Sequence, residues 1–167
     1  MTDAMTDAEL LDRCRTAPDL YPALQDAMQQ VLGHKLFTLM SIDWDRGEAA
    51  RIYTSHPVEY PVGGRKPLGR MTGWGQVVLE NHQPWIGRTA EEIEWAFFDH
   101  ALIASMGCAS CLNQPVIDPD APGGPRVIGT MNLLDAAGHY GDDAPARAAP
   151  FAALLLEPYR AWARVGG

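Results

Sequence analysis

The stretch that decides the fold is ASCLNQPVI at residues 109–117, which is followed after a loop by RVIGTMNLL at residues 126–134. Both runs are rich in apolar and β-branched residues, and the loop between them is rich in proline and glycine. Two such runs joined by a turn-forming loop are typical of a β-hairpin. We therefore predict two antiparallel strands in this part of the chain.

A second hairpin is indicated upstream. The run LFTLMSI at residues 36–42 has strand composition, DWDRG at residues 43–47 has turn composition, and ARIYT at residues 50–54 can return as its partner. Before it, the apolar residues between Leu20 and Val31 recur at helical spacing, and Gly33 is suited to end that helix.

The middle of the chain is less regular. Residues 56–70 are rich in proline and glycine with weak periodicity, so we expect an irregular connection with one short edge strand. A short helix is expected at residues 73–81 and a brief strand at residues 84–86. Thr89 and Glu92 have the spacing of a capping box, which predicts a helix over residues 90–102.

The C-terminal part predicts a helix that begins at Pro150 and bends at Pro158. Its apolar residues recur every three to four positions: Phe151, Leu154, Leu155, Tyr159 and Trp162. Two hairpins with helices before, between and after them predict an α+β fold. We expect an antiparallel sheet of about five or six strands with helices on both faces.

Length and charge bound the remaining possibilities. The 167 residues and 47% hydrophobic content suit one core, so we expect a single domain over residues 17–165 preceded by an N-terminal extension at residues 1–16. The net charge of −8 argues against nucleic-acid and membrane-surface partners. The N-terminus carries acids and no apolar run is long enough to span a bilayer, so we expect a cytoplasmic protein.

With these elements in place the chain resembles the GAF family of small-molecule sensor domains over nearly its whole length. The resemblance rests on the opening helix, Ser41-Ile-Asp43 at the end of the first strand, the Gly73-Trp-Gly helix start, and the late hairpin with Pro115 and Gly129. It implies a sheet with the terminal helices on one face and a pocket on the other, roofed by the shorter middle helices. It identifies an architecture and leaves the ligand and any cofactor unknown.

The alternation of strand residues places the pocket face. Phe37 and Leu39 suit the core, which leaves Thr38 and Met40 on the opposite face with Leu36. In the late hairpin, Met131 and Leu133 suit the core, which leaves Thr130 and Asn132 on the pocket face with Cys111 and Asn113 as neighbours. The middle helices that roof the pocket add aromatic residues. The candidate ligand-binding residues are Thr38, Met40, Trp74, Trp85, Trp95, Phe98, Asp99, Cys111, Asn113, Thr130 and Asn132.

Two readings of the polar residues stay open. Buried polar groups need hydrogen-bond partners, which a ligand or water could supply, or which they could find in one another and in the roof helices. The acids Glu91 and Glu92 are better explained as helix-start residues than as a catalytic pair.

The motif Cys108-Ala-Ser-Cys111 has redox or zinc spacing, but no second cysteine pair exists for zinc, and we expect no metal site. Because the pair enters a predicted strand, residues three apart are expected on opposite faces, and buried free thiols are the simpler interpretation.

One GAF-like family, the free methionine sulfoxide reductases, performs thiol chemistry. The positions of its two cysteines correspond here to Gly73-Trp74-Gly75 and to the neighbourhood of Ala104. Its substrate-binding acids are replaced by Cys111, Asn132 and Leu134. The Asp-Ile-Pro tripeptide of bilin-binding members is missing, and the Asn-Lys-Phe-Asp-Glu pattern of cyclic-nucleotide-binding members cannot be traced.

We therefore predict a stand-alone sensory or regulatory module in signal transduction that binds an unidentified small molecule and is not an enzyme. One alternative is a thiol-dependent reductase that uses Cys108 and Cys111. The other is a dimerisation module without a ligand. The amphipathic first and last helices favour a homodimer in either non-enzymatic case.

Overall fold

The computed structural model describes residues 4–69, 71 and 73–165, so residues 1–3 of the N-terminal extension and Arg70 in the irregular connection lie outside the described part. The chain forms a sheet in which all neighbouring strands are antiparallel, in the order β3-β2-β1-β6-β5-β4. The strands are β1 (Leu36–Asp43), β2 (Glu48–Thr54), β3 (Arg65–Pro67), β4 (Trp85–Gly87), β5 (Ser110–Asp118) and β6 (Arg126–Asp135). Both predicted hairpins and the short edge strand are present.

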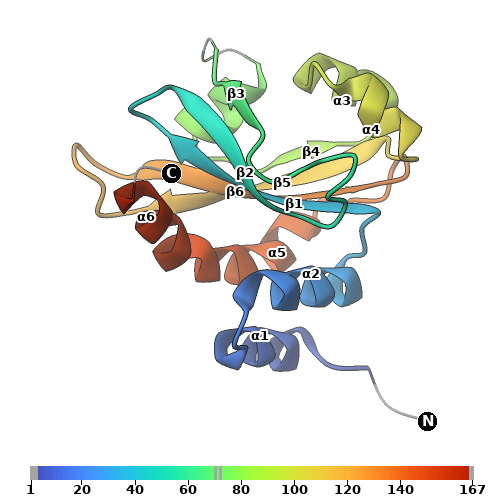
Figure 1. Cartoon of the computed structure of the whole chain (residues 1–167). Coiled ribbons are helices and arrows are strands. Elements are labelled where there is room, and N and C mark those ends of the chain that lie inside the picture. Colours follow the sequence, from blue (N-terminus) through green and yellow to red (C-terminus); the bar gives the residue numbers. More distant parts are fainter. Residues whose placement is uncertain (1–3, 70, 72, 166–167) are drawn as a thin grey trace.

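The helices form layers on both sides of this sheet (Figure 1). One layer contains α2 (Leu20–Val31), α5 (Ala144–Ala152) and α6 (Leu156–Arg164), with α1 (Asp7–Thr16) packed on the outside of α2. The other side carries a single π-helical turn, η1 (Gln76–Glu80), together with α3 (Ala90–Ala96) and α4 (His100–Ser105). The α+β architecture expected from the sequence is confirmed.

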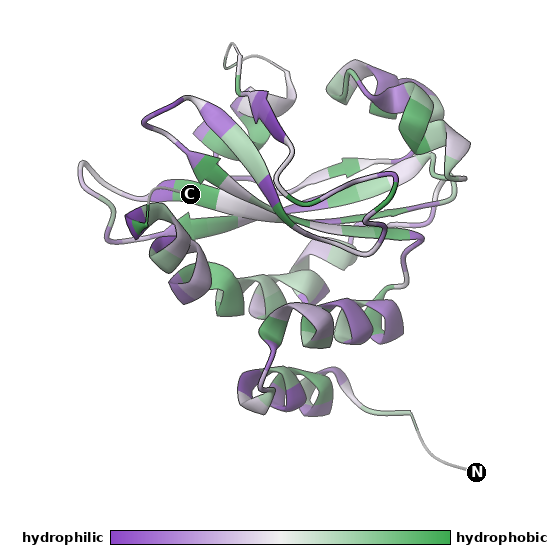
Figure 2. Ribbon diagram, in the orientation of Figure 1, coloured by the Kyte–Doolittle hydropathy of each residue, from purple (hydrophilic) through white to green (hydrophobic). Residues whose placement is uncertain are grey.

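The main core fills the space between the sheet and the terminal helices. Phe37 and Leu39 of β1 and Met131 and Leu133 of β6 are fully buried there, as their alternation predicts. Figure 2 shows that hydrophobic residues concentrate in the central strands, whereas the helices below carry hydrophobic and hydrophilic residues in turn. The alternate residues of the same strands, such as Thr38 and Met40, lie on the opposite face of the sheet and do not belong to this core.

The N-terminal extension contains a helix that the sequence analysis did not predict. Thr6 and Glu9 form a capping box at the start of α1, and Leu10 and Cys14 are buried in the main core. Arg147 of α5 makes two hydrogen bonds to the carboxylate of Asp7. Residues 7–16 are thus packed against the rest of the domain.

Two of the predicted helices differ from the structure. The helix expected over residues 90–102 begins as predicted, with Glu92 N donating to Thr89 Oγ1, but it ends at Ala96 and restarts at His100. Phe97 at the break has an extended backbone and packs against Trp74 and Trp85, which turns the chain toward the sheet. The prediction of one continuous helix was wrong because this side-chain packing outweighs local helix preference.

The C-terminal helix begins earlier than predicted, at Ala144, and Pro150 lies inside it. Its irregular stretch is the 3₁₀ turn η2 (Ala153–Leu155), one turn before Pro158. Proline lacks the N–H that would bond to the carbonyl of Leu154, so the α-helical ladder is interrupted there. The predicted bend exists, but it lies before the proline.

Among the described residues, no helix is long and apolar enough to cross a membrane.

Candidate functional site

A cavity of about 570 Å³ lies between the upper face of the sheet and the short middle helices. Its floor comes from β1, β2, β5 and β6, and its roof from Trp74, just before η1, and from the segment where α3 gives way to α4. Its wall on the third side comes from the connection between β2 and β3, from β3 itself and from the chain just after it. The lining combines apolar side chains with four charged ones, Arg51, Arg65, Lys66 and Asp99, and with the polar residues of the floor.

Most of the residues predicted for this site do line the cavity. They are Thr38, Met40, Trp74, Phe98, Asp99, Asn113, Thr130 and Asn132. The alternation of the strands was sufficient to place the five floor residues, because a strand residue and its second neighbour share a face. Whether these residues bind a ligand stays a prediction.

Three predicted residues do not line the cavity. Trp95 is 60% exposed on the outside of α3, because Ile93 is the residue of that helix that turns inward. Trp85 of edge strand β4 packs against Trp95 and Phe97, so it supports the roof from behind. Cys111 shares the face of Asn113 and donates to its Oδ1 at 3.5 Å, but it is buried in an apolar cluster with Ile93 of α3 and Ile103 of α4 and does not line the cavity.

The polar floor residues are joined in a hydrogen-bonded row across three strands. The register pairs Asn113 with Asn132 and Asn132 with Thr38. Asn113 Nδ2 donates to Asn132 Oδ1 at 2.8 Å, and Asn132 Nδ2 donates to Thr38 Oγ1 at 3.2 Å. Trp74 Nε1 of the roof donates to Asn113 Oδ1 at 2.9 Å. These polar residues therefore find hydrogen-bond partners in one another and in the roof, which is the second of the two interpretations that the sequence left open.

This row connects the sheet to the roof at a single point. Asn132 Nδ2 also donates to the carbonyl of Thr38 at 3.4 Å, whereas Asn113 Nδ2 donates to Asn132 Oδ1 and carries a second N–H, since an amide nitrogen has two hydrogens. The row can therefore hold its own geometry and still donate to a ligand.

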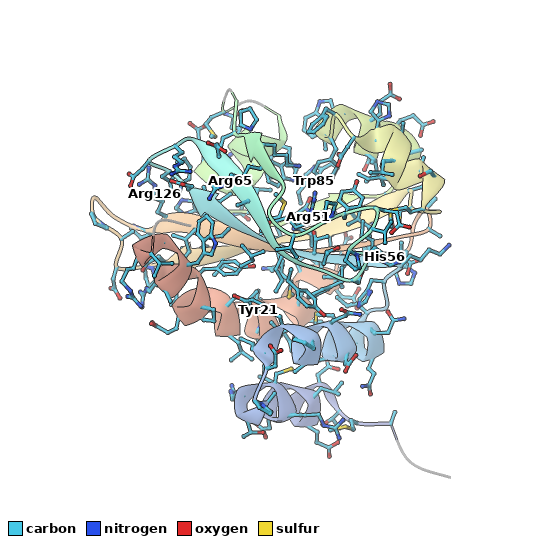
Figure 3. All side chains as sticks on the ribbon, viewed as in Figure 1. Tyr21, Arg51, His56, Arg65, Trp85 and Arg126 are labelled. Carbon is cyan, nitrogen blue, oxygen red and sulfur yellow. The ribbon has the colours of Figure 1, made fainter. Side chains whose placement is uncertain are left out.

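The charged wall of the cavity was not predicted from the sequence. Arg51 comes from β2, Tyr60 from the irregular connection, and Arg65 and Lys66 from β3. Tyr60 OH donates to Asp99 Oδ2 at 2.8 Å, and the Arg51 guanidinium lies 4.5 Å from the centre of the Tyr60 ring. Figure 3 shows Arg51 and Arg65 on the side of the sheet away from α2 and α5. These residues lie in or beside a segment without periodicity, and no pattern in the sequence marks them.

Burial changes the acid–base properties of this wall. Burial lowers the pKa of Lys66 below its ordinary value, and the carboxylate of Asp99 offsets part of that effect. Burial also raises the pKa of Tyr60, and the Asp99 carboxylate that accepts its hydrogen bond raises it further. Tyr60 is therefore a neutral donor at physiological pH.

The two cysteines of the C-x-x-C motif have the properties of buried thiols. Both are free and buried, as expected. Cys108 precedes β5 and lies in the same apolar cluster as Cys111, so the prediction that the two lie on opposite faces of a strand was wrong. Burial raises the pKa of Cys108 to about 11 and that of Cys111 to about 12. A reactive cysteine needs the opposite shift, because the thiolate is the nucleophile.

We expect Cys108 and Cys111 to react very slowly with a water-soluble disulfide reagent at about pH 8, since they are 3% and 0% exposed and protonated. The rate is measured for the Cys14→Ser variant, with and without guanidinium chloride. Both thiols should react rapidly once the protein is unfolded. Rapid reaction of either thiol in the folded protein would contradict the buried-thiol interpretation.

Among the described residues, no group of three or more His, Cys, Asp or Glu side chains is placed to hold a metal ion.

An antiparallel six-stranded sheet with the terminal helices on one face and a helix-roofed cavity on the other is the GAF fold. No protein-family model matches the sequence, and no curated protein matches it either. Solved structures match it clearly. The chain is similar to the GAF domain of a phosphoenolpyruvate-protein phosphotransferase from Coxiella burnetii, with a TM-score of 0.70 and 21% identity over 99% of both chains.

Two further structures show the range of proteins with this fold. The GAF domain of a two-component sensor histidine kinase from Bacillus halodurans matches with a TM-score of 0.66 and 11% identity, over 87% of this chain and 95% of that one. The free methionine-R-sulfoxide reductase from Neisseria meningitidis, in complex with its substrate, matches with a TM-score of 0.65 and 17% identity, over 100% and 96%. Identities this low establish the fold alone.

Proposed function

We propose that this chain is a sensory GAF module that binds a small molecule in the cavity between the sheet and the roof and does not catalyse a reaction. The observation that carries the proposal is the cavity itself. Its volume of about 570 Å³ and its apolar lining with a few polar groups fit the usual small-molecule site. Structural neighbours that include a sensor-kinase domain favour the sensory role.

The roof offers a route from binding to signalling. It consists of helices of seven and six residues separated by the extended Phe97. Phe98 at this break is 79% exposed although it also borders the cavity. A ligand that fills the cavity would hold the segment between α3 and α4 in one arrangement and change the surface that Phe98 presents. The homodimer through the terminal helices stays a prediction.

We favour this function over a thiol-dependent reductase, although one structural neighbour is named as a reductase. Cys108 and Cys111 lie outside the cavity lining and have raised pKa values. A nucleophile must reach the substrate, and both thiols are buried. Leu36, Tyr60 and Leu134 of their apolar cluster line the cavity, whereas the two cysteines do not.

Native mass spectrometry and a thermal-shift screen test the proposal, because a ligand that binds only the folded state raises its stability. We expect hits with the wild-type protein that disappear in an Ala49→Phe variant. Ala49 of β2 lines the cavity, so the added ring occupies ligand space. Ala146→Phe, on the outer side of the domain, is the matched control and should keep the hits. Hits that persist in Ala49→Phe would place binding elsewhere and contradict the proposal.

A further inference from the structure

The side chains around the cavity carry a net positive charge, whereas the whole chain carries a net negative charge. Three basic side chains, Arg51, Arg65 and Lys66, line it, against one carboxylate, Asp99. The protein as a whole carries a net charge of −8. An excess of positive charge inside a concave site of an acidic protein attracts anions to that site selectively, since the low-dielectric walls focus the field.

Arg65 is compensated at the edge of the cavity. Its guanidinium lies 3.4 Å from Asp43 Oδ2 and 4.0 Å from Glu48 Oε2. These carboxylates belong to β1 and β2, and neither lines the cavity. The charge of Arg65 is therefore already satisfied from outside.

Arg51 and Lys66 are in a different position. Arg51 Nη1 donates to the carbonyl of Pro61, but its Nε is buried without a hydrogen-bond partner in the described part of the chain. Lys66 Nζ lies 5.7 Å and 5.6 Å from the ring centres of Phe97 and Phe98, and no hydrogen bond or ion pair holds it among the described residues. A buried donor such as Arg51 Nε is normally paired, and leaving it unpaired is unfavourable. Lys66 is half-buried, so its ammonium group can bind a ligand.

The cavity also contains an unpaired acceptor. Asp99 Oδ2 is bound by Tyr60, whereas Asp99 Oδ1 is buried and has no partner within residues 4–69, 71 and 73–165. The Arg51 guanidinium stacks on the same Tyr60 ring, so the unpaired donor and the unpaired acceptor belong to one continuous wall. A single ligand could supply a hydrogen-bond partner to both Arg51 Nε and Asp99 Oδ1.

We infer that the ligand of this cavity is a small organic anion. Its carboxylate or phosphate group is bound by Arg51 and Lys66, and a hydrogen-bond donor elsewhere on it meets Asp99 Oδ1. Its apolar part lies against Met40, Trp74 and Phe97, which border the same space. This inference deepens the function proposed above and rests on it.

The experiment uses a probe panel in three matched sets: aromatic and aliphatic carboxylic acids, the primary amides of the same acids, and phosphomonoesters of the corresponding alcohols. Binding is measured by saturation-transfer NMR, followed by titration calorimetry for the hits. We expect acids, phosphomonoesters or both to bind, and each amide to bind at least about tenfold more weakly than its acid, because it lacks the charge. The acid and phosphate sets show which anion the site prefers.

Charge-removing variants connect any hit to the two cations. Lys66→Met and Arg51→Gln should each weaken binding of the anion by about tenfold or more and leave binding of a neutral probe unchanged. Lys35→Met is the matched control, since Lys35 is the chain's other lysine, is exposed and lies outside the cavity lining. It should bind like the wild type. Circular dichroism verifies that each variant is folded. If Arg51→Gln does not fold, the affinity of Lys66→Met alone decides the outcome.

Two results would overturn the inference while leaving the proposed function intact. One is amides that bind as tightly as their acids. The other is anion affinity that survives both Lys66→Met and Arg51→Gln. If no member of any set binds, the inference fails, whereas the proposed function is decided by the thermal-shift screen and its Ala49→Phe variant.

Discussion

Replacing Gly129 by alanine is expected to lower the free energy of unfolding by about 3 kcal/mol, because the added methyl group has no space. A Cβ at this position would collide with the ring of Tyr159 and the carbonyl of Met40. Neither group can move easily. Tyr159 is fully buried and its hydroxyl donates to Thr130 O at 3.0 Å, while Met40 O belongs to the neighbouring strand β1.

Chemical denaturation followed by circular dichroism measures this change. Gly141→Ala is the matched control, since a Cβ there meets only the carboxylate of Asp143, the end of a side chain that can move. The control should change the free energy of unfolding by less than about 1 kcal/mol. Equal stability of Gly129→Ala and the wild type would mean that α6 does not pack against β6 as described.

The same close contact explains why the late hairpin was so informative in the sequence. Gly129 lies in a strand of otherwise bulky residues, and a glycine in such a place often marks a close approach by another group. Sequence alone shows that something approaches, but not that it is the ring of Tyr159, thirty residues further along the chain. The identity of that partner depends on the path of η2 and α6.

Strand alternation explains why the floor of the cavity was predictable. A strand with period two has only two faces, so assigning Phe37 and Leu39 to the core necessarily places Thr38 and Met40 on the other side. The three-strand row through Asn132 follows from the register, which the sequence does not determine. The face was predictable, and the hydrogen bonds were not.

The roof and the charged wall were harder to predict for a physical reason. One helix over residues 90–102 would carry both Trp95 and Phe98, but α3 ends at Ala96 with Trp95 on its outer side, and Phe98 follows the break at Phe97. Tyr60 and Lys66 depend on a connection without periodicity, where the backbone route is set by tertiary contacts such as the bond from Tyr60 to Asp99. Such contacts between distant segments leave no local pattern.

Replacing Asn132, the central residue of the hydrogen-bonded row across the sheet, is also expected to destabilise the protein strongly. Asn132→Leu preserves the volume of the side chain but removes the partner of Asn113 Nδ2 and of Thr38 Oγ1. Both groups are buried. A buried polar group left without its partner costs about 1–3 kcal/mol, so we expect a loss of about 2–4 kcal/mol in the free energy of unfolding.

A double-mutant cycle distinguishes this mechanism from simple misfit. Asn113→Leu alone should also be destabilising, because it orphans Asn132 Oδ1 and Trp74 Nε1. In Asn113→Leu/Asn132→Leu the two leucines face each other across β5 and β6, and neither leaves an amide behind. We expect the double variant to be more stable than the sum of the single losses by about 1–2 kcal/mol.

Additive losses in this cycle would mean that the two asparagines contribute independently, and that their contact at 2.8 Å has little energetic weight. Coupled losses would show that the row acts as one unit. In that case its members are held in place before any ligand arrives, which lowers the entropic cost of binding at the cavity floor. The row would then be a rigid base opposite the roof segment around Phe97, to which the proposed function assigns the response to a ligand.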